Sequence, residues 1–447
     1  LKCIESSLDV HYEFDESKLK ECEGLWFKFV NQSEIQTDQK WITLFFNTTA
    51  YEELERLVKE GKMIRLGDWF EPSRGNAVYL CLASWGLVSG TKDYGAKEFF
   101  EFNESKKING MQSKKGTIKV PGECLYPAIL DTASIKTFTF TEKDWENLRD
   151  KGKNVYLFVC HKPKNEQIKD YLEWGENECK NRSGRPCNEA ESAKAREKEK
   201  SLFYGWYDLG GVLLTPLMAK YYAQSCPHFF ISEYSTVTHN DIITLIPKVN
   251  VEEYDVDQLK SILGKLQNKK KERIKELLDD IEKNSKTMLS NKELKALTAY
   301  LNSTLVWNWS EFKGRAVGPL ALEVNIAKDI PIPNLKGLSE KDVDDLAKLF
   351  DELEAEARKH QDMKNVLHTL NFLKPIKQKI DRKICEIYGL KIDVEALWNS
   401  TVEMMQRRIT GITREKLDLG SEKEIKIKKG RKGKTVSLES FMYEEEE

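Results

Sequence analysis

The chain has 447 residues, 40% of them hydrophobic, which is enough for two or three domains with separate cores. Its 71 basic and 73 acidic side chains leave a formal net charge of −2, which excludes a uniformly basic nucleic-acid binder and leaves local charge segregation as the alternative. No apolar run approaches the roughly 18 residues of a membrane span, and nine scattered cysteines favour reduced thiols, so we expect a cytoplasmic protein without a membrane partner.

Residues 1–62 are interpreted as a linker or the end of a preceding domain. The chain begins with Leu1 rather than Met, and we expect it to be a fragment of a longer protein. A strand-like run from Trp41 to Phe46 is followed by a helix from Tyr51 to Lys59, in which the leucines share one face.

Residues 63–250 are typical of an irregular, mostly β domain, because Gly and aromatic residues separate short β-prone runs. These runs are Ala77 to Leu82, Asn154 to Cys160, His228 to Ser232 and Asp241 to Ile246. The charged stretch from Ile168 to Lys200 predicts helices at its two ends and a loop around Arg182 to Cys187.

Residues 251–290 predict a helical insertion, either one long exposed helix or a helical hairpin. Its cluster from Lys269 to Arg273 is open to two interpretations, a solvated face or a contact with a phosphate backbone. Residues 291–335 return to the β domain through a helix from Asn291 to Leu305, a polar turn and a strand. We expect Trp307 and Trp309 to pack in the core rather than to stack on bases.

Residues 336–415 predict a C-terminal helical region. Ser339 and Asp342 have the spacing of a capping box at the start of a helix through His360. A second helix is expected from Ile376 to Tyr388, ended by Gly389. Residues 416–447 form a basic and then acidic tail, interpreted as a disordered segment or as an electrostatic arm on DNA.

Two absences bear on enzyme activity. None of the 25 glycines forms the Gly-x-Gly turn that lets a methyltransferase backbone approach its cofactor. None of the 12 prolines is adjacent to another, so the chain lacks the Asp/Asn-Pro-Pro-aromatic loop that holds a flipped adenine. We therefore expect no methyl transfer by this chain alone, and we assign it no catalytic residue.

Several short motifs occur in a fixed order along the chain. They are Ile64-Arg65-Leu66-Gly67-Asp68-Trp69-Phe70, Ser89-Gly90-Thr91-Lys92-Asp93, Leu125-Tyr126-Pro127, Leu301-Asn302-Ser303-Thr304, Ile330-Pro331-Ile332-Pro333, Ile380-Asp381-Arg382 and Tyr388-Gly389-Leu390. Their order, over roughly residues 63–390, resembles the C-terminal, target recognition half of adenine-specific (N6) DNA methyltransferases of type II and type IIG restriction-modification systems. The sequence departs from that pattern in Ser-Gly-Thr-Lys and in a longer spacer before Gly90.

The resemblance implies an α+β fold, namely an irregular, mostly β target recognition domain with inserted long helices and a C-terminal helical region. It implies sequence-specific binding of double-stranded DNA on behalf of an N-terminal methyltransferase domain or subunit. S-adenosylmethionine would belong to that missing catalytic region, and no cofactor or metal is expected in this chain.

Six residues in loop-like places are candidates for DNA contact, because Arg, Lys, Thr and His can reach base edges or phosphates. They are Arg74, Lys92, Thr236, Thr238, His239 and Arg315. The competing interpretations are structural: Arg315 caps the preceding helix or pairs with Glu311, and His239 is a satisfied turn histidine.

Three rival hypotheses stay open at this point. A stand-alone specificity subunit would carry two recognition domains, and one is found. A metal-dependent nuclease is compatible with the Glu-x-Lys triplets, such as Glu293 to Lys295, which a chain this charged also contains by chance. A zinc site at Cys160, His161, Cys179 and Cys187 competes with free structural thiols, because the spacings match no closed zinc pattern.

Overall fold

The computed structural model describes the chain in blocks separated by gaps. The blocks are 46–75, 87–88, 99–103, 117–130, 132–151, 153, 155–178, 186–189, 191–198, 200, 203–209, 214–223, 225–238, 241–255, 271–314, 318–361, 366–410, 426–428 and 435–437. One compact unit is Ala50–Glu447, and of the other, Leu1–Thr49, residues 46–49 are described. The run expected at Ala77 to Leu82, and all but the last residue of that at Trp41 to Phe46, lie outside these blocks.

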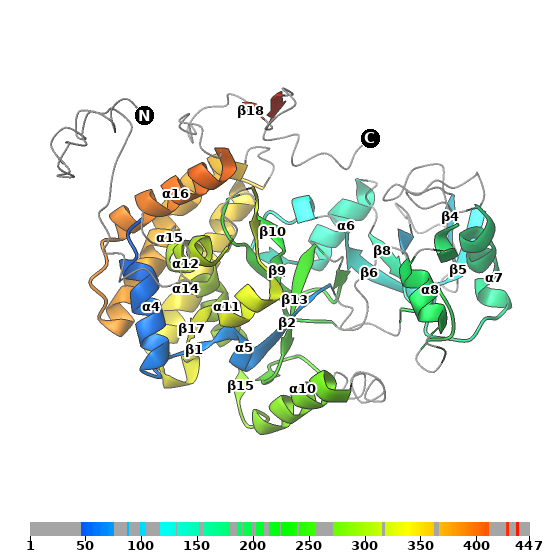
Figure 1. Ribbon diagram of the computed structural model, residues 1–447, viewed down its shortest axis with the longest axis horizontal. Coiled ribbons are helices and arrows are strands. Elements are labelled where there is room, and N and C mark those ends of the chain that lie inside the picture. Colours follow the sequence, from blue (N-terminus) through cyan, green and yellow to red (C-terminus); the bar gives the residue numbers. More distant parts are fainter. Residues whose placement is uncertain are drawn as a thin grey trace, which may run out of the picture. The chain divides into compact units, whose positions relative to one another are not determined.

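A five-stranded sheet forms the centre of the larger unit (Figure 1). In spatial order its strands are β2 (Phe70–Arg74), β13 (Ile242–Pro247), β9 (Leu217–Lys220), β11 (Phe229–Ser232) and β7 (Thr139–Phe140). Neighbouring strands are antiparallel, except that β11 and β7 are parallel. All six residues of β13 are buried, as expected for a strand covered on both faces. The strands predicted in this part of the chain, β11 and β13, are confirmed.

A four-stranded sheet has its own hydrophobic core. Its strands are β12 (Val237–Thr238), β6 (Leu125–Ile129), β8 (Tyr156–Phe158) and β3 (Leu87–Val88), and the pair β4 (Phe99–Asn103) and β5 (Thr117–Pro121) extends the same part of the chain. Its core contains the buried aromatic residues Phe158, Tyr171 and Trp206. Helices α7 (Lys169–Glu173) and α8 (Glu191–Lys198) confirm the helical ends expected for the charged stretch.

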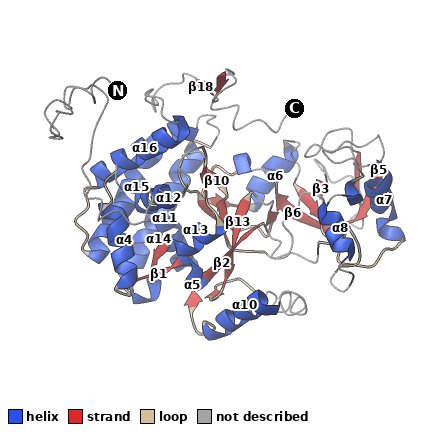
Figure 2. Ribbon diagram, in the orientation of Figure 1, coloured by secondary structure: helices blue, strands red, loops and turns tan. Residues whose placement is uncertain are grey.

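A layer of helices packs on the five-stranded sheet (Figure 2). Its members are α4 (Thr49–Lys59), α11 (Asn291–Leu301), α12 (Thr304–Lys313), α14 (Glu340–Lys359), α15 (Val366–Tyr388) and α16 (Val394–Thr410). Helix α11 contacts both β11 and α14, and one core joins Leu217 and Ile231 of the sheet to Leu346 of α14. The core is therefore continuous across the segment boundary that the sequence suggests near residue 335.

Short elements complete the fold, whose predicted α+β class is confirmed. They are β1 (Met63–Arg65), α5 (Leu66–Trp69), α6 (Glu142–Asp150), β10 (Tyr222–Ala223), β14 (Asn250–Val251), α10 (Lys271–Lys283), β15 (Met288–Leu289), β16 (Leu320–Ala321), α13 (Val324–Asp329), β17 (Pro331–Pro333), β18 (Lys426–Lys428) and β19 (Thr435–Ser437). Among the described residues, no helix has the length and apolar composition that a bilayer span needs.

Two helix predictions need correction. The helix expected to run through Leu305 ends at Leu301, and α12 takes the place of the expected polar turn. The new helix begins there because the Ser303 hydroxyl accepts a hydrogen bond from the backbone nitrogen of Val306 and caps it. The helix expected to begin after Pro375 begins ten residues earlier, at Val366, and runs through the proline. Leu370 and Leu373, just before the proline, are buried, and their packing offsets the bond that proline cannot make, while Asn371, Phe372 and Pro375 are exposed.

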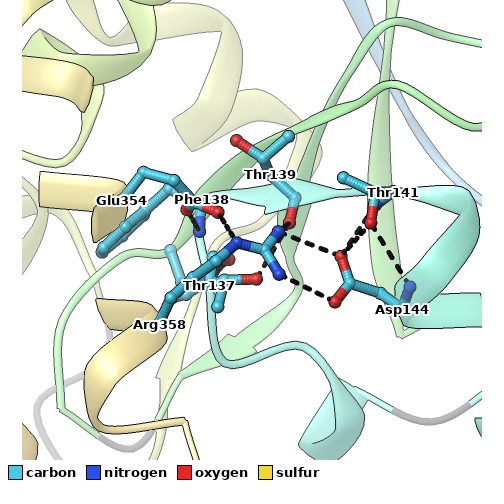
Figure 3. A network of polar contacts seen from close by, with 8 residues as sticks. Thr137, Phe138, Thr139, Thr141, Asp144, Glu354 and Arg358 are labelled. Atoms are coloured by element: carbon cyan, nitrogen blue, oxygen red, sulfur yellow. Dashed lines mark hydrogen bonds and ion pairs between the residues drawn. The ribbon is translucent and has the colours of Figure 1, made fainter. Parts of the chain in front are cut away.

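Arg358 joins the helical layer to the sheet (Figure 3). Its guanidinium lies between Asp144 of α6, at 2.9 and 3.0 Å, and Glu354 of its own helix, at 2.6 Å, and it also donates to the Thr139 carbonyl. Glu354 accepts in turn from the backbone nitrogen of Phe138. Burial is the largest single effect on the pKa of Asp144 and would raise it, but the bonds from Arg358 and Thr141 together outweigh burial and hold that pKa below its usual value. Burial dominates at Glu354 and raises its pKa.

Candidate nucleic-acid interface

The motifs around Asn302 and Asp381 contact each other although they are far apart in sequence. The Asn302 side chain exchanges two hydrogen bonds with the backbone of Phe229, accepting at 3.0 Å and donating at 2.9 Å, so that it pairs with β11 as a strand would. Asp381 accepts from the backbone nitrogens of Thr304 and Leu305, which caps α12. Burial raises the pKa of Asp381 to about 6 against the opposing effect of these bonds.

The Ile-Pro-Ile-Pro motif also has a structural role. It forms β17, which pairs with β1 so that Ile332 lies opposite Ile64. Arg65 of β1 donates to the Asp329 carbonyl at 2.6 Å and forms an ion pair with Glu55 of α4 at 2.7 Å. These motifs, together with α4, therefore form a structural platform.

A buried ion pair on this platform holds in place the residues just before β16 and just after β10. Arg408 of α16 and Glu311 of α12 are each 2% exposed and form two hydrogen bonds, of 2.8 and 2.9 Å. Arg408 also donates to the carbonyls of Gly318 and Ser225, at 2.7 and 2.9 Å. Trp307 donates its indole N–H to Glu311 at 2.9 Å. The polar atoms of the pair are thus bonded on several sides, as a buried ion pair requires.

A partly exposed cluster of side chains lies at one end of the five-stranded sheet. The Arg74 guanidinium stacks over the Tyr221 ring, 3.9 Å from its centroid, and lies 3.8 Å from Asp241. Tyr221 packs edge-on against Tyr222, which is 43% exposed. Tyr222 lies in β10, where it pairs in register with Ala321 of β16. The ends of β2, β9 and β13 therefore place a partly exposed cation on the buried Tyr221 ring and near the exposed Tyr222 ring.

Of the six candidate residues, Arg74 belongs to this cluster. Lys92, His239 and Arg315 lie outside the described residues. Asp241, two positions after His239, is in the cluster, and Gly318, three positions after Arg315, is held by Arg408.

Thr236 and Thr238 have a different environment. They are 1% and 0% exposed, and Thr238 lies in β12 opposite Ile129 of β6. The Thr236 hydroxyl lies 3.4 Å from that of Ser232. Burial of this kind fits packing rather than direct contact with a base edge, and their assignment to DNA contact stays a prediction.

Tyr221, Tyr222 and Asp241 were missed by sequence reasoning. The adjacent tyrosines after β9 were a detectable signal, because aromatic residues are enriched at binding surfaces, although Tyr221 is buried and only Tyr222 is exposed. Their proximity to Arg74 depends on strand pairing and was not visible in the sequence. The cluster from Lys269 to Arg273 has no described side chains, and the tail is described only at β18 and β19.

The residues considered for zinc have separate partners. The Cys160 thiol hydrogen-bonds to that of Cys124, which raises the pKa of Cys124 and lowers that of Cys160. His161 Nδ1 lies 2.8 Å from a carboxylate oxygen of Asp208, within hydrogen-bond distance. Cys179 and the side chain of Cys187 lie outside the described part. Within the blocks that are described, no three His, Cys, Asp or Glu residues are arranged to hold a metal ion.

Comparison with known proteins gives a partial match. No family model matches the chain. Over 148 residues the chain is 24% identical to the type II methyltransferase M.AccI of Acinetobacter calcoaceticus, a stretch that covers 33% of this chain and 22% of that protein. The chain thus spans about a fifth of the length of this curated relative. The crystal structure of the type IIG restriction endonuclease BpuSI aligns with 81% of this chain and 33% of its own, at 12% identity and a TM-score of 0.37. The sequence similarity supports a relationship to restriction-modification proteins.

Proposed function

We propose that the chain is the sequence-specific double-stranded DNA recognition module of an adenine-specific DNA methyltransferase. Methyl transfer from S-adenosylmethionine would be carried out by an N-terminal domain or partner subunit. The sequence similarity to a type II methyltransferase supports the class of system. The observation that carries DNA contact is the Arg74 cluster at the end of the five-stranded sheet.

The chemistry of this cluster suits a duplex. An arginine reads guanine edges or phosphates through the outer edge of its planar guanidinium. Stacking over Tyr221 fixes that plane, while the Arg74 side chain is still 37% exposed and can exchange its partner. Tyr222 adds an exposed aromatic ring beside it, which suits contact with sugars or base faces.

The first test is binding of the purified chain to duplexes of random sequence over a salt series. Affinity should fall as salt rises, because each neutralised phosphate releases counterions and contributes about −0.9 to the logarithmic slope. Selection from a random duplex pool should yield a consensus that contains an adenine. An affinity that does not change with salt would contradict contact with the phosphate backbone.

The second test compares two arginines with similar surroundings. Arg149 lies 5.2 Å from the Trp145 ring centroid and 3.3 Å from Asp150, so it resembles Arg74 in having an aromatic and an acidic neighbour. Arg74→Ala should weaken binding roughly tenfold, whereas Arg149→Ala should leave it unchanged. Equal losses in the two variants would remove the assignment of the interface to this end of the sheet.

The partner is tested separately. A reading frame that contains or adjoins this chain should encode a Gly-rich cofactor turn and an Asn-Pro-Pro-aromatic loop. Co-expression of that partner with the chain should give adenine methylation at the selected consensus, and neither protein alone should do so. Cleavage of DNA by the chain alone with a divalent metal ion would instead favour a nuclease.

A further inference from the structure

Asp241 places a negative charge beside the cation that the proposed function assigns to DNA. The residue lies at the start of β13, where its carbonyl accepts from the backbone of Tyr221 at 2.8 Å. On the next strand, Arg74 pairs in register with Ile243, and Gly75 donates to Ile242. The backbone of three adjacent strand ends therefore holds Asp241 near Arg74.

The pair between them is loose and accessible. A charge-assisted hydrogen bond from nitrogen to a carboxylate is about 2.7–2.9 Å long, whereas the closest distance from Arg74 to Asp241 is 3.8 Å. The two side chains are 37% and 33% exposed. Water and salt screen such a pair, so its contribution to stability is small and another anion can replace the carboxylate.

An acidic side chain at a DNA interface also has a cost. A phosphate that approaches Arg74 meets the repulsion of the Asp241 carboxylate, and like charges brought together at an interface weaken binding. A duplex bound through its phosphates alone meets this cost in full. In a correct sequence, Arg74 contacts a base edge and no phosphate needs to approach the carboxylate, so the cost falls mainly on sequences that lack that contact.

We propose that Asp241 is a specificity-determining residue, which holds the Arg74 guanidinium and repels phosphates so that duplexes of the wrong sequence bind weakly. The inference rests on the proposed function, since it assumes that Arg74 faces DNA. It adds the means by which non-specific binding at this end of the sheet is suppressed.

The test is Asp241→Asn, which keeps the size of the side chain and removes its charge. Affinity for random duplex at low salt should rise about tenfold, and the ratio of affinities for selected and random sequences should fall. The matched control is Asp150→Asn, beside Arg149 on α6, which should change neither quantity. Thermal unfolding of each variant checks that the fold is retained.

A double variant tests whether the effect of Asp241 on DNA affinity depends on Arg74. In the Arg74→Ala background, Asp241→Asn should give a smaller gain in affinity, because only the direct repulsion between the carboxylate and phosphates is left to remove. A gain of the same size as in the wild-type background would overturn the inference, and so would an unchanged affinity of the single variant. Weaker binding of Asp241→Asn to the selected sequence alone would show that Asp241 instead accepts a hydrogen bond from a base.

These outcomes differ from a failure of the proposed function. If the wild-type chain selects a sequence with salt-dependent affinity while Asp241→Asn behaves as wild type, the inference fails and the function stands. If the wild-type chain and all variants lack affinity for duplex DNA, the proposed function and the inference fail together.

Discussion

The interior of the helical layer and the end of the five-stranded sheet each contain an arginine paired with a carboxylate, and the two pairs differ in every physical respect. Arg408 and Glu311 are 2% exposed and joined by two short hydrogen bonds. Arg74 and Asp241 are about one third exposed and 3.8 Å apart.

The difference separates an anchor from a contact that can be exchanged. Removal of one partner from a buried pair leaves an uncompensated charge in a region of low dielectric. Loss of one partner from an exposed pair leaves a charge that water solvates. We therefore expect the stability of the fold to depend on the first arginine and the binding of DNA to depend on the second.

The largest expected effect is that of Arg408→Met. The substitution leaves the Glu311 carboxylate buried without its positive partner, although the Trp307 indole still donates to it. It also removes the hydrogen bonds to the carbonyls of Gly318 and Ser225. The free energy of unfolding should fall by about 3–5 kcal/mol, measured by urea denaturation. The neighbouring Arg407, 47% exposed and paired with Glu403, provides the control, and Arg407→Met should have little effect. Similar losses in the two variants would contradict the assignment of an anchor.

A smaller loss is expected for Asn302→Ala. The substitution removes the amide that pairs with both backbone groups of Phe229 and leaves those buried groups unsatisfied. Unfolding free energy should decrease by about 1–3 kcal/mol. Asn325 on α13 is exposed, so Asn325→Ala should be neutral within experimental error. A neutral Asn302→Ala would show that this side chain does not hold α11 to the sheet.

Acidic pH should destabilise the sheet through His228. Burial, with a smaller effect of Lys220, lowers the pKa of this imidazole well below 6.5, and its ring donates to the Thr137 carbonyl at 2.9 Å. The unfolded chain therefore binds a proton near pH 6.5 that the folded chain binds only at lower pH. The free energy of unfolding should fall as pH decreases below about 6.5, by up to about 1.4 kcal/mol per pH unit, with no contribution above pH 7.5.

The comparison variant for this pH effect is His228→Gln, which keeps a hydrogen-bond donor and does not titrate. Asp381 acts in the opposite direction, because its folded pKa of about 6 lies above 3.8 and stability from that group falls as pH rises through this interval. The difference between the wild type and His228→Gln cancels the Asp381 contribution. Parallel pH profiles of the two proteins would contradict the role of His228.

The smallest effect on stability is expected for Arg74→Ala. The variant loses the stack on Tyr221 and a loose ion pair at an exposed site. The free energy of unfolding should change by less than about 1 kcal/mol, even though DNA binding should weaken. A loss as large as that of Arg408→Met would show that both arginines are structural.

Elements with local signals were predictable from the sequence. The N-cap at Ser339, the left-handed Gly389 with φ of +65°, and the amphipathic helix α4 all depend on residues within a few positions of one another. The break at Asn302 was not predictable in this way, because the side chain finds its partner in β11. The passage of α15 through Pro375 has a similar origin in tertiary packing.

The same distinction between local signals and tertiary contacts applies to the candidate site. Arg74 next to a glycine was recognisable as a potential contact residue from the sequence. The opposite environments of Arg74 and Thr238, one partly exposed and the other fully buried, depend on which strands pair. Tyr221 and Asp241 join Arg74 only because β2, β13 and β9 are neighbours in the sheet.

The sequence by itself determined the helices with local caps and the order of the motifs, and the resemblance carried by that order implied the α+β class. The capped helices follow from backbone preferences and spacing within short segments. Only the tertiary structure decided that most of those motifs pack against one another, and that one arginine is buried as an anchor while another stays exposed. Burial and dielectric environment result from contacts between distant segments, and they determine whether a charged side chain stabilises the fold or is available to a ligand.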